Sequence, residues 1–178
     1  MDQKSLNVRS LVDMGVLALA KGEIEQAAQK FNEVLVLGYE EIYAIYGLGK
    51  VAYHQGDFSS ARRCFIEAIE KSPGADPFML ISGLALEAQA LEALAFLAAS
   101  QDQMKRAARL LGATEDFHQK FLYTRTSRER AERTSAIATV REALGEEGFA
   151  KAWEEGKAMT QEQAVAYAKE VAYSGEVG

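Results

Sequence analysis

Small and large apolar residues alternate at helical spacing along the stretch GLGKVAYHQGDFSSARRCFIEAIEKSP, residues 47–73. A soluble helix normally fills its buried positions with large side chains. Small residues at fixed positions therefore indicate neighbouring helices that approach closely. The pattern predicts helices at about 5–20, 24–37, 41–54 and 58–71. The small positions are Gly49, Ala52, Gly56, Ala61 and Ala68, and the large ones are Phe58, Phe65 and Ile69, with Pro73 closing the run.

The same pattern occurs 34 residues earlier in the chain. A fixed period of this length is the mark of a repeat protein, in which each repeat forms one helical unit. The glycine that follows the first helix of each repeat is expected at a tight turn, where a left-handed backbone favours glycine. The matched positions are Gly15 and Gly49, Ala18 and Ala52, Gly22 and Gly56, Ala27 and Ala61, and Phe31 and Phe65.

These residues and their spacing resemble the tetratricopeptide repeat. The resemblance implies that each repeat is a pair of antiparallel helices and that the pairs stack into a right-handed superhelix with a concave groove. Small residues on the first helix would let the second helix approach closely. Phe31 and Phe65 would then fill the seam to the next repeat.

A third unit departs from the strict period. Gly83 keeps the step of 34 residues from Gly49, but the helix is expected to continue through residues 78–100, and its partner helix is expected to begin at Asp102. The repeats are accordingly assigned to residues 1–124. Their individual ranges are about 5–38, 41–73 and 77–123.

Residues 125–178 are expected to form a helical C-terminal cap. Thr126 or Ser127 is a candidate N-cap for a helix that runs to about Leu144 and ends at Gly145. A short helix containing Phe149 and Trp153 follows. Thr160 and Gln163 match a capping box for a last helix over 161–173. The predicted fold class is therefore all-α: antiparallel helix-pair repeats with a helical cap.

The tail resembles the C-terminal end of the repeat region in large bacterial ATP-dependent regulators of the LuxR type. The matching segments are RAARLLGA at 106–113, ALGEEGFAKAWEEGKAMT at 143–160 and EQAVAYA at 162–168. An ATPase motif of the form G-x-x-x-x-G-K-[ST] is absent from the sequence, and no helix-turn-helix module is recognisable. The resemblance therefore implies only the repeat arm of such a regulator.

One face of the second repeat's first helix is the candidate binding site, because the resemblance implies that first helices line the groove. Tyrosines offer a large contact area with few rotatable bonds, which suits recognition. Alternatively, these rings pack against the neighbouring first helix. The candidate residues are Tyr43, Tyr46, Lys50, Tyr53 and His54. The equivalent face of the first repeat, a pocket or a surface for another repeat, comprises Arg9, Val12, Val16, Leu19 and Ala20.

Composition and charge narrow the possible functions. The net charge of −6 argues against a general nucleic-acid binder, and the sequence has neither a secretory signal nor an apolar run of membrane-spanning length. The lone Cys64 fits a reducing, cytoplasmic compartment. Residues 105–133 carry eight Lys or Arg against four Asp or Glu. We interpret this stretch, which includes Arg133, as a solvated helix face, with binding to an acidic partner or a phosphate backbone as the alternative.

Catalysis and cofactor binding are not predicted. His54 and His118 lie in different helices without partners at metal-ligand spacing, and nothing nearby activates Cys64. We therefore expect no enzyme activity, no metal and no cofactor.

The leading hypothesis is a non-catalytic module that binds a protein or peptide in its groove. One alternative is the sensor or oligomerisation arm of a larger ATP-dependent transcriptional regulator, with other domains of that protein as partners. Another is a homo-oligomeric scaffold, because the first repeat is expected to expose an apolar face. That bare face also favours Met1 as a boundary within a larger protein.

Overall fold

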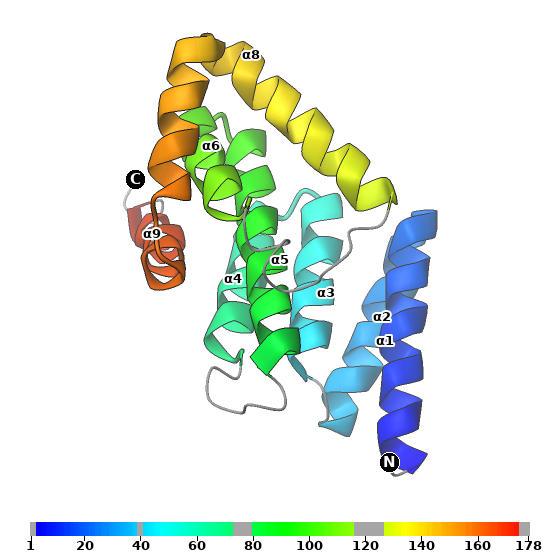
Figure 1. Ribbon diagram of the computed structural model, residues 1–178. Helices are drawn as coiled ribbons and strands as arrows, with labels where there is room; N and C mark the ends of the chain where they lie inside the picture. The colour runs from blue at the N-terminus through cyan, green and yellow to red at the C-terminus, as the bar shows by residue number, and fades with distance from the viewer. Residues whose placement is uncertain (1–2, 39–40, 73–79, 116–126, 175–178) are drawn as a thin grey trace. The chain divides into compact units, whose positions relative to one another are not determined.

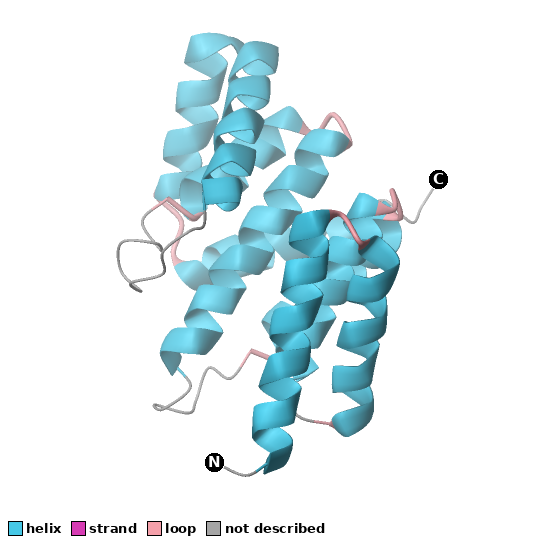
Figure 2. Cartoon of the chain, turned by 90° about the vertical axis from the view of Figure 1, so that its right-hand side faces the viewer, coloured by secondary structure: helices cyan, strands magenta, loops and turns pink. Residues whose placement is uncertain are grey.

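The computed structural model describes the chain apart from residues 1–2, 39–40, 73–79, 116–126 and 175–178. Every regular element in the described residues is a helix, as Figure 2 shows, which confirms the all-α fold class. The chain divides into two compact units, Met1–Ser72 and Pro73–Gly178, which we call the N-terminal and C-terminal units. Figure 1 labels the helices of both units.

The N-terminal unit consists of two helix pairs. Its helices are α1 (Gln3–Lys21), α2 (Ile24–Leu37), α3 (Glu41–His54) and α4 (Phe58–Glu70). Each helix packs on the next in chain order, and α1 also contacts α3. The predicted helices agree with these bounds to within two residues at each end. Gly22 and Gly56 both have φ of 78° at the turns within the pairs, which confirms the need for glycine there.

The alternation of small and large residues has a direct physical cause. Phe31 is fully buried between α1 and α3. A Cβ atom added at Gly15 would lie 2.6 Å from its ring, and one added at Gly47 would lie 2.4 Å away. In the second pair, a Cβ at Gly49 would lie 2.6 Å from the ring of Phe65. The glycines therefore leave the space that the phenylalanine rings fill, as the repeat pattern predicted.

The C-terminal unit comprises α5 (Leu80–Ser100), α6 (Met104–Ala113), α8 (Ser127–Lys157) and α9 (Gln161–Ser174). The first two residues of the expected helix over 78–100 lie outside the described residues. The helix expected to begin at Asp102 begins at Met104 instead. Asp102 has φ of 58°, a left-handed conformation that a helix cannot contain, so it forms part of the turn.

Two sequence signals in the tail are confirmed. Gly145 has φ of 69° and ψ of 166°, so it breaks α8 into a first arm at 127–144 and a second arm at 146–157. At the start of α9, the Thr160 amide donates to Gln163 Oε1 at 2.8 Å. The Gln163 amide in turn donates to Thr160 Oγ1 at 3.2 Å, which completes the capping box.

Candidate protein-binding surface

The five candidate residues follow one side of α3. Tyr43, Tyr46, Lys50 and Tyr53 are half-buried, and His54 is exposed. Their spacing of three or four residues places them on neighbouring turns of the same helical face. The structure thus arranges them as a continuous row on α3.

Ring contacts connect this row to α4. Tyr46 lies 5.7 Å from Phe65 between ring centroids, and Tyr53 lies 5.9 Å from Phe58. The Lys50 ammonium lies 6.0 Å from the centroid of the Tyr46 ring, at the edge of cation–π range. Tyr46 therefore contacts Phe65 of α4 and the Lys50 ammonium.

Tyr53 occupies a similar place at the end of the row. Its ring meets the ring of His54 edge-on, with centroids 5.9 Å apart and an interplanar angle of 73°. His54 is exposed, so its imidazole is held at the surface by a ring that is itself packed on α4.

The first repeat shows how these register positions are used when a second repeat follows. Val16, the counterpart of Lys50, is 55% exposed, whereas Leu19, the counterpart of Tyr53, is 6% exposed. Lys50 therefore occupies a solvent-facing register position, and Tyr53 occupies a packing position. The rings of Tyr46 and Tyr53 contact α4, the second helix of the same repeat, so the row combines solvent-facing side chains with packed ones. Its role in binding stays a prediction.

The basic stretch at the start of α8 only partly matches the expected solvated face. Arg128 and Glu132 form an exposed ion pair of 2.9 Å at i, i+4, as the pattern suggested. Arg133 was wrongly grouped with them, because only 7% of its side chain is exposed. Its acidic partners are Glu92 on α5, 41 residues away in the sequence, and Glu115 in the turn after α6, 18 residues away.

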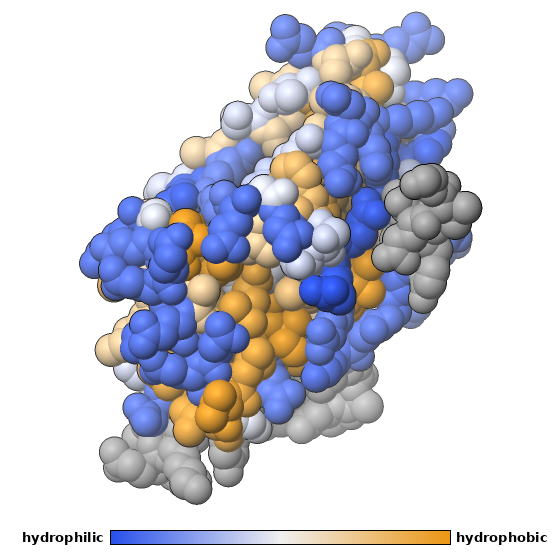
Figure 3. Space-filling view, turned by 180° about the vertical axis from the view of Figure 1, so that it is seen from behind, coloured by the Kyte–Doolittle hydropathy of each residue, from blue (hydrophilic) through white to orange (hydrophobic). Residues whose placement is uncertain are grey.

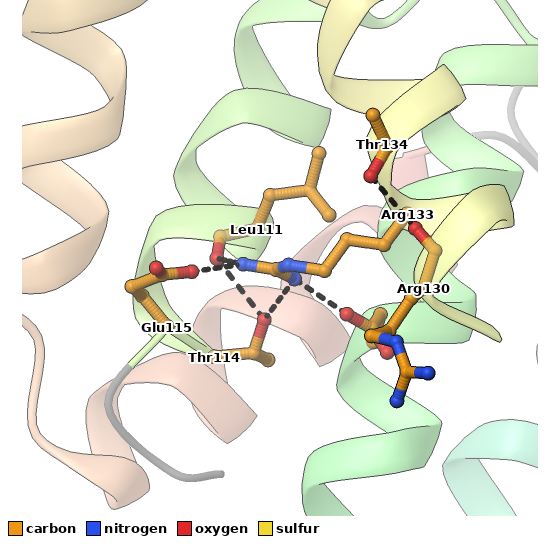
Figure 4. Close-up of polar contacts among 7 residues, drawn as sticks. Leu111, Thr114, Glu115, Arg130, Arg133 and Thr134 are labelled. Carbon is orange, nitrogen blue, oxygen red and sulfur yellow. Dashed lines mark hydrogen bonds and ion pairs between the residues drawn. The ribbon is translucent and has the colours of Figure 1, made fainter. Parts of the chain in front are cut away.

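The Arg133 guanidinium is surrounded by acceptors (Figure 4). One terminal nitrogen donates to Glu92 on α5 at 2.5 Å and to Thr114 at 3.2 Å. The other donates to the Leu111 carbonyl at 3.0 Å and to Glu115 at 2.5 Å. A buried charge is tolerated when hydrogen bonds and opposite charges surround it, and this network meets that condition while joining α5, α6 and α8.

A groove of about 500 Å³ lies along α8, between its two arms. Its aromatic wall consists of Phe149 and Trp153, whose ring centroids are 5.2 Å apart. Arg141 lies 4.5 Å from the centroid of the Phe149 ring, and Arg133 lies 5.7 Å from that of Trp153. The lining residues are Glu115, Arg130, Arg133, Thr134, Ile137, Arg141, Glu146, Phe149, Ala150, Trp153 and Glu154. The lining carries three arginines and three glutamates, so it favours neither an anion nor a cation.

Two glycines bring α6 and the second arm of α8 into backbone contact. A Cβ at Gly112 would lie 2.3 Å from the Trp153 carbonyl oxygen, and one at Gly156 would lie 2.0 Å from that of Arg109. Arg109 also pairs with Glu155 at 2.5 Å. Its hydrogen bond holds the pKa of the Glu155 carboxyl below its ordinary value.

The last helix α9 contacts α5 and α6. Gln161 donates to Glu87 Oε1 on α5 at 2.9 Å. Burial raises the pKa of the Glu87 carboxyl, and the Gln161 hydrogen bond opposes that shift. Arg106 on α6 donates to the Tyr167 carbonyl of α9 at 2.8 Å, and its guanidinium lies 4.8 Å from the Tyr167 ring centroid. These contacts fix α9 against α5 and α6.

The described residues contain neither a candidate metal-binding group nor a candidate membrane-spanning helix. No three His, Cys, Asp or Glu side chains among them are grouped so that they could hold a metal ion. None of the helices in this part of the chain is both long and apolar enough to cross a membrane.

Comparison with known proteins identifies two kinds of relative. Residues 12–76 and 46–99 match the family model described as "Tetratricopeptide repeat". Proteins of Mycobacterium bovis and Mycobacterium tuberculosis, each named "Putative HTH-type transcriptional regulator", are 31% identical over 158 residues. This alignment covers 88% of the chain and 17% of each regulator, so the chain spans about a sixth of the length of these relatives.

Another relative matches a shorter part of the chain. The "Protein CTR9 homolog" of Arabidopsis thaliana is 36% identical over 63 residues, which cover 35% of this chain and 6% of that protein. The comparison with solved structures finds no match.

Proposed function

Because the chain belongs to the tetratricopeptide repeat family through residues 12–99, we propose that its N-terminal unit is a non-catalytic surface that binds a protein segment. The row on α3 is the binding site, with Tyr43, Lys50 and His54 in contact with the partner. Tyr46 and Tyr53 act from beneath as supports. The observation that carries this proposal is a pair of contacts: the Lys50 ammonium lies over the Tyr46 ring, and the His54 ring meets the Tyr53 ring edge-on.

The chemistry of the row favours a particular kind of segment. Packing against the tyrosine rings restricts the motion of Lys50 and His54, so binding costs less side-chain entropy than it would for side chains without such contacts. A segment with a carboxylate next to an apolar side chain would match an ammonium group that lies beside the Tyr46 ring. We therefore propose an extended peptide or a helix with acidic and apolar positions on one face.

Site-specific photo-crosslinking tests the position of this surface. A photoreactive amino acid replaces Lys50 in one variant and Arg63 in a second. Arg63 is an exposed basic residue on α4 and serves as the matched control. In a lysate of the source cells, we expect position 50 to capture a protein that position 63 does not capture. Equal capture from both positions would refute the α3 site.

Charge reversal then tests the chemistry. Lys50→Glu should weaken binding of the captured protein by about tenfold or more, since it places a carboxylate against a carboxylate. Arg63→Glu should leave that affinity within about twofold, because an exposed charge away from the site contributes little. An affinity unchanged by Lys50→Glu would overturn the proposed role of this cation.

The similarity to the mycobacterial proteins favours a wider setting. We propose that these residues are the repeat arm of a larger transcriptional regulator, because the alignment extends over 88% of the chain. An antibody against the C-terminal unit should then detect a native protein far larger than 178 residues in source cells. A band at the mass of these residues alone would instead indicate a separate adaptor.

A further inference from the structure

The outer side of α1 combines exposed apolar residues with exposed charges. Met14 is 51% exposed and Leu17 is 55% exposed. Asp13 and Lys21, also exposed, form no ion pair with another residue in the part of the chain that the structure describes. We call these residues, together with Ala20 between them, the α1 outer stripe. In the space-filling view of Figure 3, hydrophobic surface in orange lies among hydrophilic side chains in blue.

The stripe occupies the register that α3 uses to pack on the first repeat. Leu17 corresponds to Val51, which is buried in the core formed with α1 and α2. Asp13 corresponds to Gly47, where an added Cβ would lie 2.4 Å from Phe31. A preceding repeat with a phenylalanine at its seam would therefore collide with the Asp13 side chain. The stripe retains an apolar half, but it cannot receive an ordinary repeat in this geometry.

The stripe is instead complementary to itself. Asp13 and Lys21 lie four residues on either side of Leu17, a displacement along the helix axis of about 6 Å in each direction. When two α1 helices run antiparallel with their Leu17 residues in contact, each Asp13 lies level with the Lys21 of the other copy. The same arrangement places Met14 of one copy level with Ala20 of the other, since each lies three residues from Leu17.

We propose that a second copy of this chain docks on the α1 outer stripe, with the two α1 helices antiparallel about a two-fold axis at Leu17. A two-fold interface uses the same patch on both chains, and the stripe meets this requirement through two identical Asp13–Lys21 pairs. The overlap extends over residues 13–21 of each helix. It is smaller than a standard stable interface, so the dimer is weak and forms in a concentration-dependent way.

Disulfide trapping tests the position of the axis. In the full chain with Cys64→Ser, Leu17→Cys is compared with Val16→Cys, since Val16 and Leu17 are both 55% exposed. Diamide oxidises two thiols to one disulfide and takes up their two electrons and two protons. Only position 17 brings two Cα atoms within disulfide range across the axis. We expect about tenfold more covalent dimer from Leu17→Cys, and equal yields would overturn the proposal.

Charge exchange tests the pairing without any covalent bond. Asp13→Lys alone and Lys21→Glu alone each bring like charges together and should weaken dimerisation in sedimentation equilibrium by about tenfold. The double variant restores opposite charges and should return the dimer to nearly its original affinity. A double variant as weak as the single variants, or a wild-type protein that stays monomeric up to millimolar concentration, would overturn the proposal. Circular dichroism checks that all variants keep their helices.

Discussion

The helices of the two units pack through different kinds of contact. In the N-terminal unit, glycines make room for rings, as Gly15 and Gly47 do for Phe31. In the C-terminal unit, glycines bring backbones into contact, and a buried arginine joins three helices. All the buried polar or charged residues in the described part of the chain, Glu92, Thr114 and Arg133, belong to the C-terminal unit.

This difference affects how each unit responds to change. An apolar seam depends on volume, and a side chain that is slightly too large can be accommodated by small shifts. A buried charge depends on the presence of every partner, since the loss of one leaves the others uncompensated. We therefore expect the C-terminal unit to show the larger effects of single substitutions.

The largest effect is expected for Arg133→Met, which leaves Glu92 buried without its counter-charge. We expect a loss of about 3–5 kcal/mol in the free energy of unfolding. Urea denaturation followed by the fluorescence of Trp153, the only tryptophan in the sequence, measures this unit. Arg128→Met, which removes an exposed pair, should cost less than about 1 kcal/mol.

A double variant distinguishes lost charge compensation from lost packing. Arg133→Met with Glu92→Leu removes both charges, so most of the lost stability should return. If the double variant is no more stable than Arg133→Met, the network contributes through its shape, and the contrast between the units disappears.

The next largest effect is expected for Gly156→Ala. A Cβ atom added at Gly156 would lie 2.0 Å from the Arg109 carbonyl oxygen. A backbone atom cannot relieve such a clash by changing rotamer, as a side chain can. We expect a cost of about 3 kcal/mol by the same fluorescence measurement. Gly148→Ala is the matched control in the same arm, because its Cβ would meet only Leu144 at 3.5 Å. That change should stabilise the helix by about 0.5–1 kcal/mol.

The corresponding substitution in the N-terminal unit is Gly47→Ala. The added methyl group collides with the Phe31 ring, at a cost of about 1–3 kcal/mol in thermal or urea unfolding followed by circular dichroism. Phe31→Leu frees space at this position, so the double variant should be more stable than the sum of the two single effects predicts. Purely additive effects would show that Gly47 is required for some other reason than the space of the ring.

The same contrast explains what the sequence could predict. The N-terminal helices, their glycine turns and the role of Phe31 follow from a pattern that recurs after 34 residues. In a repeat protein, contacts between neighbouring repeats recur with the repeat period, so they can be recognised as a pattern in the sequence. The Gly145 break and the Thr160 capping box were also predictable, since both depend on backbone chemistry within a few residues.

The burial of Arg133 had no such signal. Its partner Glu92 lies 41 residues away, on α5. The apolar pattern of α5 does not predict which of its residues contact α8. The neighbours of Arg133 in the sequence, such as Arg130, are exposed, so a local count of charges placed all of them in solvent. For the candidate site, the sequence indicated which residues share a face of α3. It did not indicate that Tyr46 and Tyr53 pack on α4, because that depends on ring positions across two helices.

The smallest change in stability is expected from substitutions at the N-cap positions of α2 and α4, which are equivalent in the two repeats. Asp57 precedes α4, and its side chain accepts the Ser60 amide at 3.0 Å. Glu23, at the same place before α2, forms no such side-chain cap. Glu23→Asp should supply the missing cap and stabilise the unit by about 0.5–1 kcal/mol, and Asp57→Glu should destabilise it. Thermal unfolding by circular dichroism checks both directions.

The pH dependence of stability tests whether the charged Asp57 cap causes this stability difference. The Ser60 backbone hydrogen bond holds the pKa of Asp57 below its ordinary value. A group with a lowered pKa contributes its full stabilisation above the ordinary aspartate pKa and loses it as the pH falls through the folded-state pKa. The stability difference between wild type and Asp57→Asn should therefore be constant near neutral pH and shrink in acid. A difference that persists after the Asp57 carboxyl is protonated would show that the side chain acts through its shape at this turn and not through its charge.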